Sequence, residues 1–471
     1  MKIKFGTSGW RDVIADGFTF ENVRKVSKAI SLYLSSKHEQ PKVVLGYDTR
    51  FMTERFAEVV AGVLTANGVS VHLCEKPTPT PVISHAVVSQ RLSGGVNITA
   101  SHNPPEYCGI KFNPETGGPA LPKVTGEIER LIEEIQNRGE KIVYIDLDEA
   151  RSKGLLVTID PKESYFESLK KVVDLSAIGK TDLKVVVDLL YGTSIGYLDE
   201  ILIRYGVKTE VIHNYRDPYF GGYRPEPDTR RLKELAGKVR ETGAGLGIVT
   251  DGDADRFGIV DDKGEIVSPN EFIALVAEHL YEFKGLKGPV GRSIATSRAV
   301  EAVAVEHGET CTITPVGFKF LGPLATEKGY VVVGEESGGL TIQNHVAEKD
   351  GILACLLALE MVAIQGKPLS EIRKAFRRKY GHFHSERIDL ELKSSKEKNS
   401  ILEKFGHINT KFAGLKIEER NRLDGYFYAF EEAGSWLLAR PSGTEPVIRV
   451  YIESKEIRTL EKLKEEVLKL I

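Results

Sequence analysis

The sequence predicts an α/β protein in which three successive units of alternating strands and helices precede a smaller α+β unit. Three observations support this prediction. At 471 residues the chain is too long for one hydrophobic core and fits three or four domains. Apolar runs alternate with amphipathic segments through most of the chain, which is typical of mostly parallel sheets covered by helices. Beyond residue 380 the pattern changes to alternating strands, as in an antiparallel α+β domain.

The first unit begins with a β-branched run at 42–47, which favours a buried strand. Residues 54–67 carry apolar residues at helical spacing and end at Gly68, which favours an amphipathic helix. The prolines of 77–81 predict a rigid extended connector. We further expect strands at 69–73 and 94–98, helices at 82–90 and 124–136, and a charged segment at 146–154 that leads out of the unit.

The same alternation predicts the later units. The second opens with the apolar run 183–188, and its last strand, 245–250, leads directly into Asp251. The three α/β units share a plan of strand, polar loop and helix, without a repeat at the level of residues. We expect helices at 194–204, 271–283, 297–307, 369–380 and 457–470, and strands at 207–212, 330–334, 384–392, 426–430 and 447–452.

Composition excludes several classes of protein. The formal net charge is −3, with 41% hydrophobic and 28% charged residues, so the overall balance predicts neither a nucleic acid nor an anionic membrane as partner. The four cysteines are widely spaced, which argues against a disulfide framework or a zinc site and fits a reducing compartment. The first residues turn polar too early for a signal peptide, and the most apolar run, 352–364, is too short to span a bilayer. We therefore expect a cytoplasmic protein.

The loop 99–105 reads Thr-Ala-Ser-His-Asn-Pro-Pro and follows the strand expected at 94–98. Its two prolines exclude a helix, so the hydroxyl of Ser101 is held on a stiff strand end with His102 beside it. Lys111, eight to ten residues further on, can bring an ammonium group back to the same place. From these residues alone, Ser101 is either a nucleophile of the hydrolase type or the carrier of a transferable group.

Three carboxylates, Asp251, Asp253 and Asp255, stand at alternate positions directly after an apolar strand, and Arg256 follows them. Hard oxygen ligands in this arrangement suit magnesium. The alternatives are an acidic surface turn or a calcium loop, but a calcium loop needs Glu at its twelfth position, where this chain has Asp262. A magnesium site favours the carrier role for Ser101, because acyl-transfer chemistry has no use for these carboxylates.

Two further loops have the composition of ligand-binding turns. In 334–339, Gly-Glu-Glu-Ser-Gly-Gly, the groups of Glu335 and Ser337 can hydrogen-bond adjacent sugar hydroxyls, although a Glu-rich turn before a helix is common. The turn 440–446, Arg-Pro-Ser-Gly-Thr-Glu-Pro, has the parts of a phosphate cradle. The candidate phosphate ligands are Arg440, Ser442, Gly443 and Thr444.

The turn 6–11 is a third segment that combines glycine, hydroxyl and guanidinium groups. Thr7, Ser8 and Arg11 either line the same site or cap the following segment. Lys319 is expected on the loop 315–319, where its ammonium either contributes a second positive charge to the site or is solvated at the surface. The same two interpretations apply to the charged residues 348–350.

A serine, three carboxylates, a sugar-type loop and a phosphate cradle describe phosphoryl transfer on a phosphosugar. The chain resembles the α-D-phosphohexomutase family over nearly its whole length. Six segments match motifs of that family: 6–11, 99–105, 251–256, 316–319, 334–338 and 440–445, with the four main loops in family order.

The resemblance implies an α/β fold of three similar mixed α/β domains plus a C-terminal TBP-like α+β domain around a central cleft. The expected domains are 1–154 with the phosphoserine loop, 155–257 with the metal-binding loop, 258–370 with the sugar-binding loop and 371–471 with the phosphate-binding loop. It also implies that Ser101 is carried as phosphoserine. One Mg²⁺ per chain is then held by its phosphate oxygen together with Asp251, Asp253 and Asp255.

The implied activity interconverts hexose 1-phosphate and hexose 6-phosphate, with hexose 1,6-bisphosphate as intermediate and activator. Lys111 and Arg256 would offset the charge of the phosphoserine, about −1.5 to −2. Lys111 is the first choice for the acid/base, provided that nearby magnesium and burial lower its pKa, and His102 is either a supporting candidate or an ordinary core or loop-bracing histidine. We expect a phosphosugar as partner, no nucleic acid, no membrane, and a monomer or homodimer.

The substrate is predicted from the sugar-binding loop. Its sequence is closer to phosphoglucomutases than to the Gly-Glu-Gln-Ser-Gly-His form of phosphoglucosamine mutases. Family members that act on both glucose and mannose phosphates carry His where this chain has Gly339. This favours glucose phosphates as substrates. A phosphomannomutase or a dual phosphomannomutase/phosphoglucomutase is the alternative, and a phosphoglucosamine mutase is less favoured than either.

Two other classes compete with a mutase. A metal-dependent sugar phosphatase would hydrolyse the phosphoserine after each turnover and needs a water path to it. A non-catalytic sensor is disfavoured because catalytic-type residues occupy every loop. We also expect the domain that carries Arg440 to swing and close the site.

Overall fold

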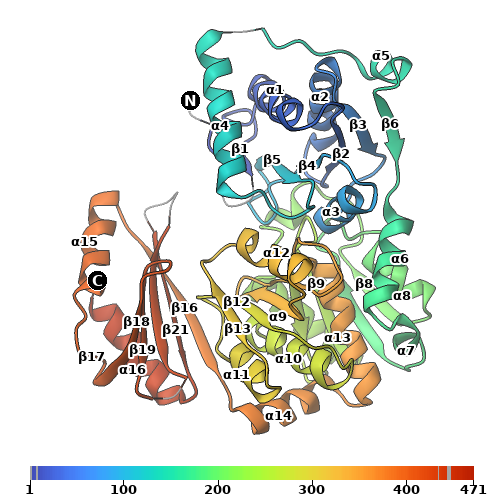
Figure 1. Ribbon diagram of the computed structural model, residues 1–471. Helices are drawn as coiled ribbons and strands as arrows, with labels where there is room; N and C mark the ends of the chain where they lie inside the picture. The colour runs from blue at the N-terminus through green and yellow to red at the C-terminus, as the bar shows by residue number, and fades with distance from the viewer. Residues whose placement is uncertain (1–2, 7–8, 140, 433, 443–446, 471) are drawn as a thin grey trace.

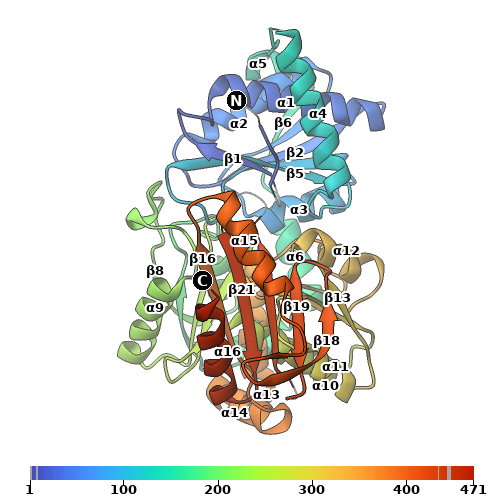
Figure 2. The same ribbon diagram turned by 90° about the vertical axis from the view of Figure 1, so that its left-hand side faces the viewer.

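The computed structural model describes residues 3–6, 9–139, 141–432, 434–442 and 447–470, and they form four sheets with helices around them (Figure 1). The first sheet and its helices make the upper lobe of Figure 1, and the second and third sheets lie below it. Figure 2 shows the C-terminal sheet as a separate layer in front of that lower part. Three mixed α/β domains and a C-terminal α+β domain are therefore present, as predicted.

The first sheet has the order β1-β5-β4-β2-β3-β6, with a parallel centre and two antiparallel strands at one edge. Residues 43–47 of β2 are all buried, as expected for a parallel strand covered on both faces. The strands are β1 (Trp10–Val13), β2 (Lys42–Tyr47), β3 (Ser70–Cys74), β4 (Gly94–Ile98), β5 (Tyr107–Pro114) and β6 (Leu156–Ile159). The helices are α1 (Phe20–Lys37), α2 (Thr53–Ala66), α3 (Thr80–Ser89), α4 (Pro122–Arg138) and α5 (Leu147–Ser152).

The second and third sheets have the orders β11-β10-β9-β7-β8 and β13-β12-β14-β15. Their strands are β7 (Lys184–Asp188), β8 (Lys208–Ile212), β9 (Leu246–Thr250), β10 (Phe257–Val260), β11 (Ile266–Val267), β12 (Val290–Ser293), β13 (Cys311–Thr314), β14 (Val332–Glu335) and β15 (Gly339–Ile342). Their helices are α6 (Lys162–Val172), α7 (Leu175–Gly179), α8 (Leu198–Arg204), η1 (Phe220–Gly222), α9 (Thr229–Thr242), α10 (Pro269–Glu282), α11 (Ala299–Glu306), α12 (Phe318–Glu327), α13 (Gly351–Gln365) and α14 (Leu369–Tyr380).

Helix α13 contains the most apolar run of the chain and is buried from Gly351 to Val362. It packs against strands of both the second and the third sheets, so apolar side chains are required all round it. Taken singly, none of the described helices has both the length and the apolar character needed to cross a membrane. Only the pair α13 and α14, bent by 85° at its break, meets that test by length and composition.

The C-terminal sheet is antiparallel, with the order β16-β21-β20-β19-β18-β17. It packs on the third domain through a small apolar cluster that includes Ile294, Phe427, Trp436 and Tyr451. Its strands are β16 (His384–Glu391), β17 (Lys411–Phe412), β18 (Leu415–Asn421), β19 (Tyr426–Phe430), β20 (Trp436–Pro441) and β21 (Val447–Ser454), and its helices are α15 (Ser395–Gly406) and α16 (Ile457–Lys469).

The three α/β domains share a plan that differs from the predicted one. The loops that carry Ser101, Asp251 and Glu335 are each followed by an antiparallel return strand and not by a helix. The return strands β5, β10 and β15 pair with the strand that the chain has just left, and this pairing satisfies their backbone groups locally. Each of these three loops is thus the turn of a β-hairpin.

Two further differences concern element bounds. The helix expected at 194–204 is restricted to α8, because Leu190, Tyr191 and Gly196 have positive φ and the chain turns there. Strand β6 lies after the expected boundary at residue 154, yet it pairs with β3 and belongs to the first sheet. Strand β10 begins at the other expected boundary, residue 257, and β11 lies after it, yet both belong to the second sheet. The four domain ranges stay a prediction.

Candidate active site

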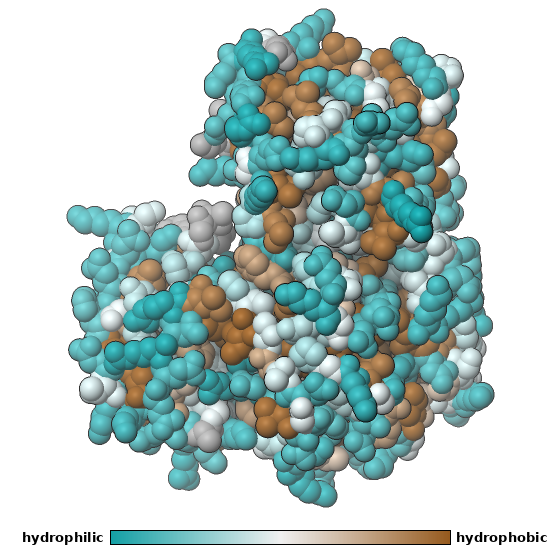
Figure 3. Space-filling view, in the orientation of Figure 1, coloured by the Kyte–Doolittle hydropathy of each residue, from teal (hydrophilic) through white to brown (hydrophobic). Residues whose placement is uncertain are grey.

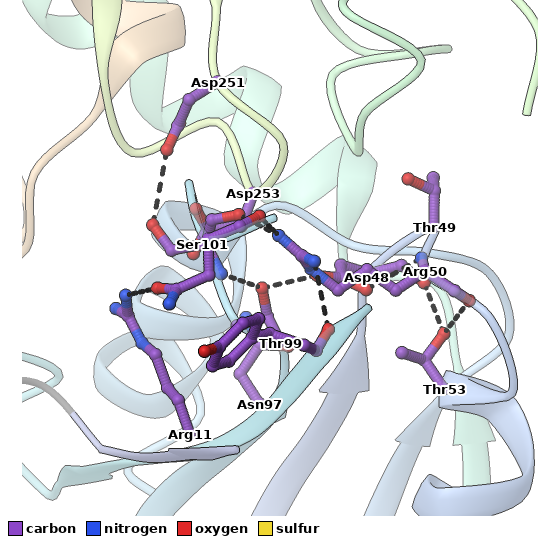
Figure 4. A network of polar contacts seen from close by, with 12 residues as sticks. Arg11, Asp48, Thr49, Arg50, Thr53, Asn97, Thr99, Ser101, Asp251 and Asp253 are labelled. Atoms are coloured by element: carbon purple, nitrogen blue, oxygen red, sulfur yellow. Dashed lines mark hydrogen bonds and ion pairs between the residues drawn. The ribbon is translucent and has the colours of Figure 1, made fainter. Parts of the chain in front are cut away.

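Ser101 lies just beyond the end of β4, at the turn between β4 and β5, and is 2% exposed. Its φ of 52° places a non-glycine residue in the left-handed region, which is uncommon and requires support from its surroundings. Its N–H donates to Thr99 Oγ1 at 2.9 Å, and its Oγ donates to Asp251 Oδ2 at 3.3 Å (Figure 4). The serine of the first domain therefore faces the acidic loop of the second.

The three carboxylates converge as predicted. Asp251, Asp253 and Asp255 are buried, and one oxygen of each lies within 4.8 Å of the others. Asp253 Oδ2 accepts hydrogen bonds from Thr80 Oγ1 at 2.7 Å and from Lys111 Nζ at 2.5 Å. Helix α3 and strand β5 of the first domain thus fix the acidic loop against Ser101.

The electrostatics of this cluster fit a hard cation. Asp253 Oδ1 and Asp255 Oδ1 are buried and have no hydrogen-bond partner among the described residues, which is costly for a carboxylate oxygen. Burial, with Asp253 and Asp255 adding to it, raises the pKa of Asp251 well above its usual value. A divalent cation would satisfy the two orphaned oxygens and relieve this repulsion, so the residues present fit a magnesium ion.

Lys111 lies opposite Asn97 in the β4–β5 pair and reaches both Asp253 and, at 3.0 Å, Asp255. Burial lowers the pKa of the Lys111 ammonium, whereas the charges of Asp253 and Asp255 together raise it by a larger amount. The carboxylates alone therefore hold the pKa of Lys111 above its ordinary value, and the lowering that we expect from bound magnesium stays a prediction. A second ammonium, Lys349 Nζ, lies 3.1 Å from Asp255 Oδ2, so two lysines flank the acidic loop.

Arg256 and His102 both approach Glu226, a residue that sequence analysis did not identify. Arg256 donates its backbone N–H to Asp251 Oδ1 at 2.9 Å and its Nη1 to Glu226 Oε1 at 2.6 Å. His102 Nδ1 lies 3.6 Å from Glu226 Oε2, just beyond hydrogen-bond distance. Burial and then the charge of Arg256 lower the pKa of His102 to about 4, so the imidazole is neutral at pH 7.

The sugar-type loop is a tight turn between β14 and β15, in which Glu335 pairs with Gly339 across the hairpin. Burial raises the pKa of Glu335, and its carboxyl is hydrogen-bonded to Ser337 and close to the charges of Lys349 and Arg256. A Cβ on Gly339 would lie 2.2 Å from Lys349 Cδ, so the stem of Lys349 occupies the space beside this position.

The phosphate-type loop begins at the end of β20. Arg440 Nε donates to Asp424 Oδ2 at 2.7 Å, and the same oxygen accepts the Val316 N–H at 3.0 Å. Lys319, expected on a loop, lies in the first turn of α12, where burial and the nearby charge of Arg440 lower its pKa. Asp424 thus connects the C-terminal domain to the cationic start of α12. Ser442 is buried, whereas Gly443 and Thr444 lie outside the described residues.

The N-terminal segment contributes Arg11. It lies on β1, opposite Gly109 of β5, and its Nη1 donates to Asn103 Oδ1 of the serine loop at 2.6 Å. Burial lowers the pKa of Arg11, and the charges of Asp253 and Asp255 counter part of this shift. Thr7 and Ser8 lie outside the described residues.

Several residues at the site were missed by sequence analysis or left undecided. The sequence did not identify Asp48, Arg50, Thr80, Glu226 or Asp424 as site residues. Two weak signals existed: Asp48-Thr49-Arg50 leaves a buried parallel strand, and Glu348-Lys349-Asp350 stands before the buried helix α13. Both are common turn compositions, so the side chains become informative only when their partners are known.

The arrangement matches known proteins along the chain. Models of phosphoglucomutase/phosphomannomutase α/β/α domain I match residues 2–139, domain II residues 163–264, domain III residues 268–380, and the C-terminal domain residues 410–470. A phosphoglucomutase/phosphomannomutase of Thermococcus kodakarensis is 32% identical, covering 96% of this chain and 94% of its own.

Two other relatives agree with this match. A probable phosphoglucosamine mutase of Pyrococcus furiosus is 32% identical over 98% of this chain and 95% of its own. The crystal structure of a putative phosphomannomutase from Thermus thermophilus superposes with a TM-score of 0.86 at 32% identity, covering 100% of this chain and 99% of that one. The chain is therefore an isomerase of the phosphoglucomutase/phosphomannomutase type and belongs to the α-D-phosphohexomutase family.

Proposed function

We propose that this protein interconverts the 1-phosphate and the 6-phosphate of a hexose, glucose being favoured, and that Ser101 carries the transferred phosphoryl group. One observation supports the carrier role above all. The Oγ of Ser101 faces three convergent carboxylates, two of which keep a buried oxygen without a hydrogen-bond partner among the described residues. A hydrolase-type serine would instead need a base on its Oγ, and the Nδ1 of the neighbouring His102 is directed at Glu226.

The proposed metal ligands are Asp251, Asp253, Asp255 and an oxygen on Ser101, which together would hold one Mg²⁺. When bound, the ion supplies positive charge that offsets the phosphoryl oxygens during transfer. The chain adds its own cations around the same point. The ammonium of Lys111 contacts the acidic loop directly, and the charges of Arg256 and Arg11 lie close enough to interact with it.

Proton transfer is assigned to the first domain. The attacking sugar hydroxyl must lose a proton, and Ser101 Oγ must gain one when it leaves without its phosphoryl group. Lys111 is buried beside the acidic loop and is the proposed acid/base, with His102 as the supporting candidate. Burial of Ser101 also limits access of water, which a mutase must exclude from the phosphoserine.

The substrate is held at two distal loops in this proposal. Glu335 and Ser337 would bind sugar hydroxyls, and the turn of Arg440, Ser442, Gly443 and Thr444, with Lys319 beside it, would bind the phosphate that is not reacting. Figure 3 shows the molecular surface stepping inward between the upper lobe and the C-terminal lobe. A hexose 1,6-bisphosphate formed by the first transfer would turn round there and return its other phosphate to Ser101.

The preference for glucose rests on Gly339 in the sugar-binding loop. The space beside Gly339 is filled by the stem of Lys349, whose ammonium lies 3.1 Å from Asp255. Lys349 therefore brings a cation between the sugar-binding and acidic loops.

Incubation of the enzyme with glucose 1-phosphate, Mg²⁺ and a trace of glucose 1,6-bisphosphate tests the proposal. We expect glucose 6-phosphate and no stoichiometric release of inorganic phosphate, whereas free phosphate as the main product would indicate a phosphatase. Peptide mass mapping should find phosphate on Ser101, and Ser101→Ala should abolish turnover. Parallel kinetics with glucose, mannose and glucosamine 1-phosphates would decide the sugar, and a higher kcat/KM for mannose 1-phosphate would contradict the preference for glucose.

A further inference from the structure

Ser101 presents a positioning problem. In the proposed cycle its Oγ alternates between a hydroxyl and a phosphate ester, so contacts made by that atom change at every transfer. The one hydrogen bond recorded for Oγ among the described residues is the long one to Asp251, at 3.3 Å. The orientation of the side chain must therefore be set by the backbone of Ser101, which is held in the left-handed conformation.

The N–H side of Ser101 is fixed through two residues. Its N–H donates to Thr99 Oγ1 at 2.9 Å, and that hydroxyl donates to Asp48 Oδ2 at 2.5 Å. Asp48 is fully buried and follows strand β2. The same carboxyl oxygen accepts the Nε–H of Arg50 at 3.1 Å, so the connection continues to a guanidinium.

The carbonyl side of the serine loop is fixed by Arg50 itself (Figure 4). Its Nη2 donates to Ser101 O at 2.5 Å and to Asn103 O at 2.7 Å, while its Nη1 donates to Pro104 O at 2.7 Å and to Tyr107 O at 3.0 Å. With the bond from Nε, all five N–H donors of the guanidinium are used. The Arg50 side chain is fully buried, so water does not compete for these contacts.

The second domain secures this arrangement from outside. Arg216 donates to Thr49 O at 3.1 Å and to Arg50 O at 3.0 Å, and the ring of Phe220 lies 5.1 Å from the Arg50 guanidinium. Arg50 thus lies between the domain that carries the serine and the domain that carries its acidic partners.

We propose that Arg50 is a positioning residue for phosphoryl transfer: with Asp48 and Thr99 it clamps both sides of the Ser101 backbone and so aims Oγ at Asp251 whether or not Oγ carries phosphate. This inference rests on the proposed role of Ser101. It requires arginine, because lysine keeps the charge but offers three donors from one point and cannot reach five separated acceptors. A misplacement of about 1 Å at a reacting atom can cost about 10²-fold in rate.

The test compares Arg50→Lys with Arg373→Lys in the full chain. Arg373 is also a buried arginine, paired with Asp261 and Glu271 far along the chain from the serine loop, so its variant controls for loss of stability. We expect Arg50→Lys to lower kcat by about 10²-fold with KM within about threefold, and Arg373→Lys to leave both unchanged. Addition of millimolar guanidinium to Arg50→Ala should restore part of kcat.

Thr99→Val is the second variant, because it removes the acceptor for the Ser101 N–H while keeping the side-chain volume. It should lower kcat without changing KM. The inference is overturned if Arg50→Lys and Thr99→Val both keep wild-type kcat, or if kcat falls only in proportion to the folded fraction measured by circular dichroism. Activity in Ser101→Ala would instead overturn the proposed function, so the two failures are distinguishable.

Discussion

Gly339 and Lys349 offer a steric test of how the sugar-binding loop and the acidic loop are connected. An alanine at 339 would place its Cβ 2.2 Å from Lys349 Cδ and 2.7 Å from Lys349 Cγ, well inside contact distance. Gly339 lies in strand β15, outside the left-handed region, so the backbone accepts alanine and the clash alone matters. The stem of Lys349 must move, and its ammonium is expected to lose the contact with Asp255.

The magnitude follows from that contact. Lys349 is only 7% exposed, and its Nζ lies 3.1 Å from Asp255 Oδ2 and 3.4 Å from Glu348 Oε1. A hydrogen bond to a charged group contributes about 1.5–3 kcal/mol. Because about 1.4 kcal/mol corresponds to a factor of ten, we expect Gly339→Ala to lower kcat/KM by about 10- to 150-fold.

A double-mutant cycle measures whether the effect passes through Lys349. Lys349→Ala removes the atoms that collide, so Gly339→Ala should change kcat/KM by no more than about threefold in that background. An equal cost in both backgrounds would refute the reasoning. Gly126→Ala is the matched control: it lies in helix α4 with no neighbouring atom within 4 Å of the new Cβ, and it should leave activity unchanged.

Three other outcomes are expected. Mg²⁺ should raise the melting temperature of the wild type and not that of Asp253→Asn, and equal shifts would argue against the proposed metal site. Burial lowers the pKa of His85 from its ordinary value of 6.5 to about 4 in the folded protein. The unfolded chain therefore takes up a proton at higher pH than the folded one, so the free energy of unfolding is greatest above pH 6.5 and decreases as the pH falls toward 4. His85→Gln should therefore lose less stability than the wild type between pH 7.5 and pH 4.5, by on the order of 2 kcal/mol in the free energy of unfolding, and identical losses would exclude this role. Binding of glucose 1,6-bisphosphate should reduce the radius of gyration in X-ray scattering if the domain that carries Arg440 closes, and an unchanged radius would count against closure.

Sequence patterns were sufficient for the fold class and for the carboxylate cluster. Alternating apolar runs and helical spacing reflect burial and backbone periodicity, which are local properties of the chain. Asp251, Asp253 and Asp255 could be predicted to converge, because alternate residues after one strand share a short loop. The same patterns predicted a helix after each functional loop, whereas the structure has the strands β5, β10 and β15, whose strand character depends on pairing with the preceding strand.

The surroundings of Ser101 show which features of the site follow from the sequence and which depend on the tertiary structure. The sequence by itself determined that a serine lies on a stiff strand end, that three carboxylates suit a hard cation, and that the loops match one family in order. Only the tertiary structure decided what surrounds them, because Arg50, Thr80, Glu226 and Lys349 come from segments with ordinary turn or helix-start compositions. Their importance depends on through-space contacts between residues tens to hundreds of positions apart, such as Lys111 with Asp253 and Arg50 with the carbonyl of Ser101. Local composition carries no information about such contacts.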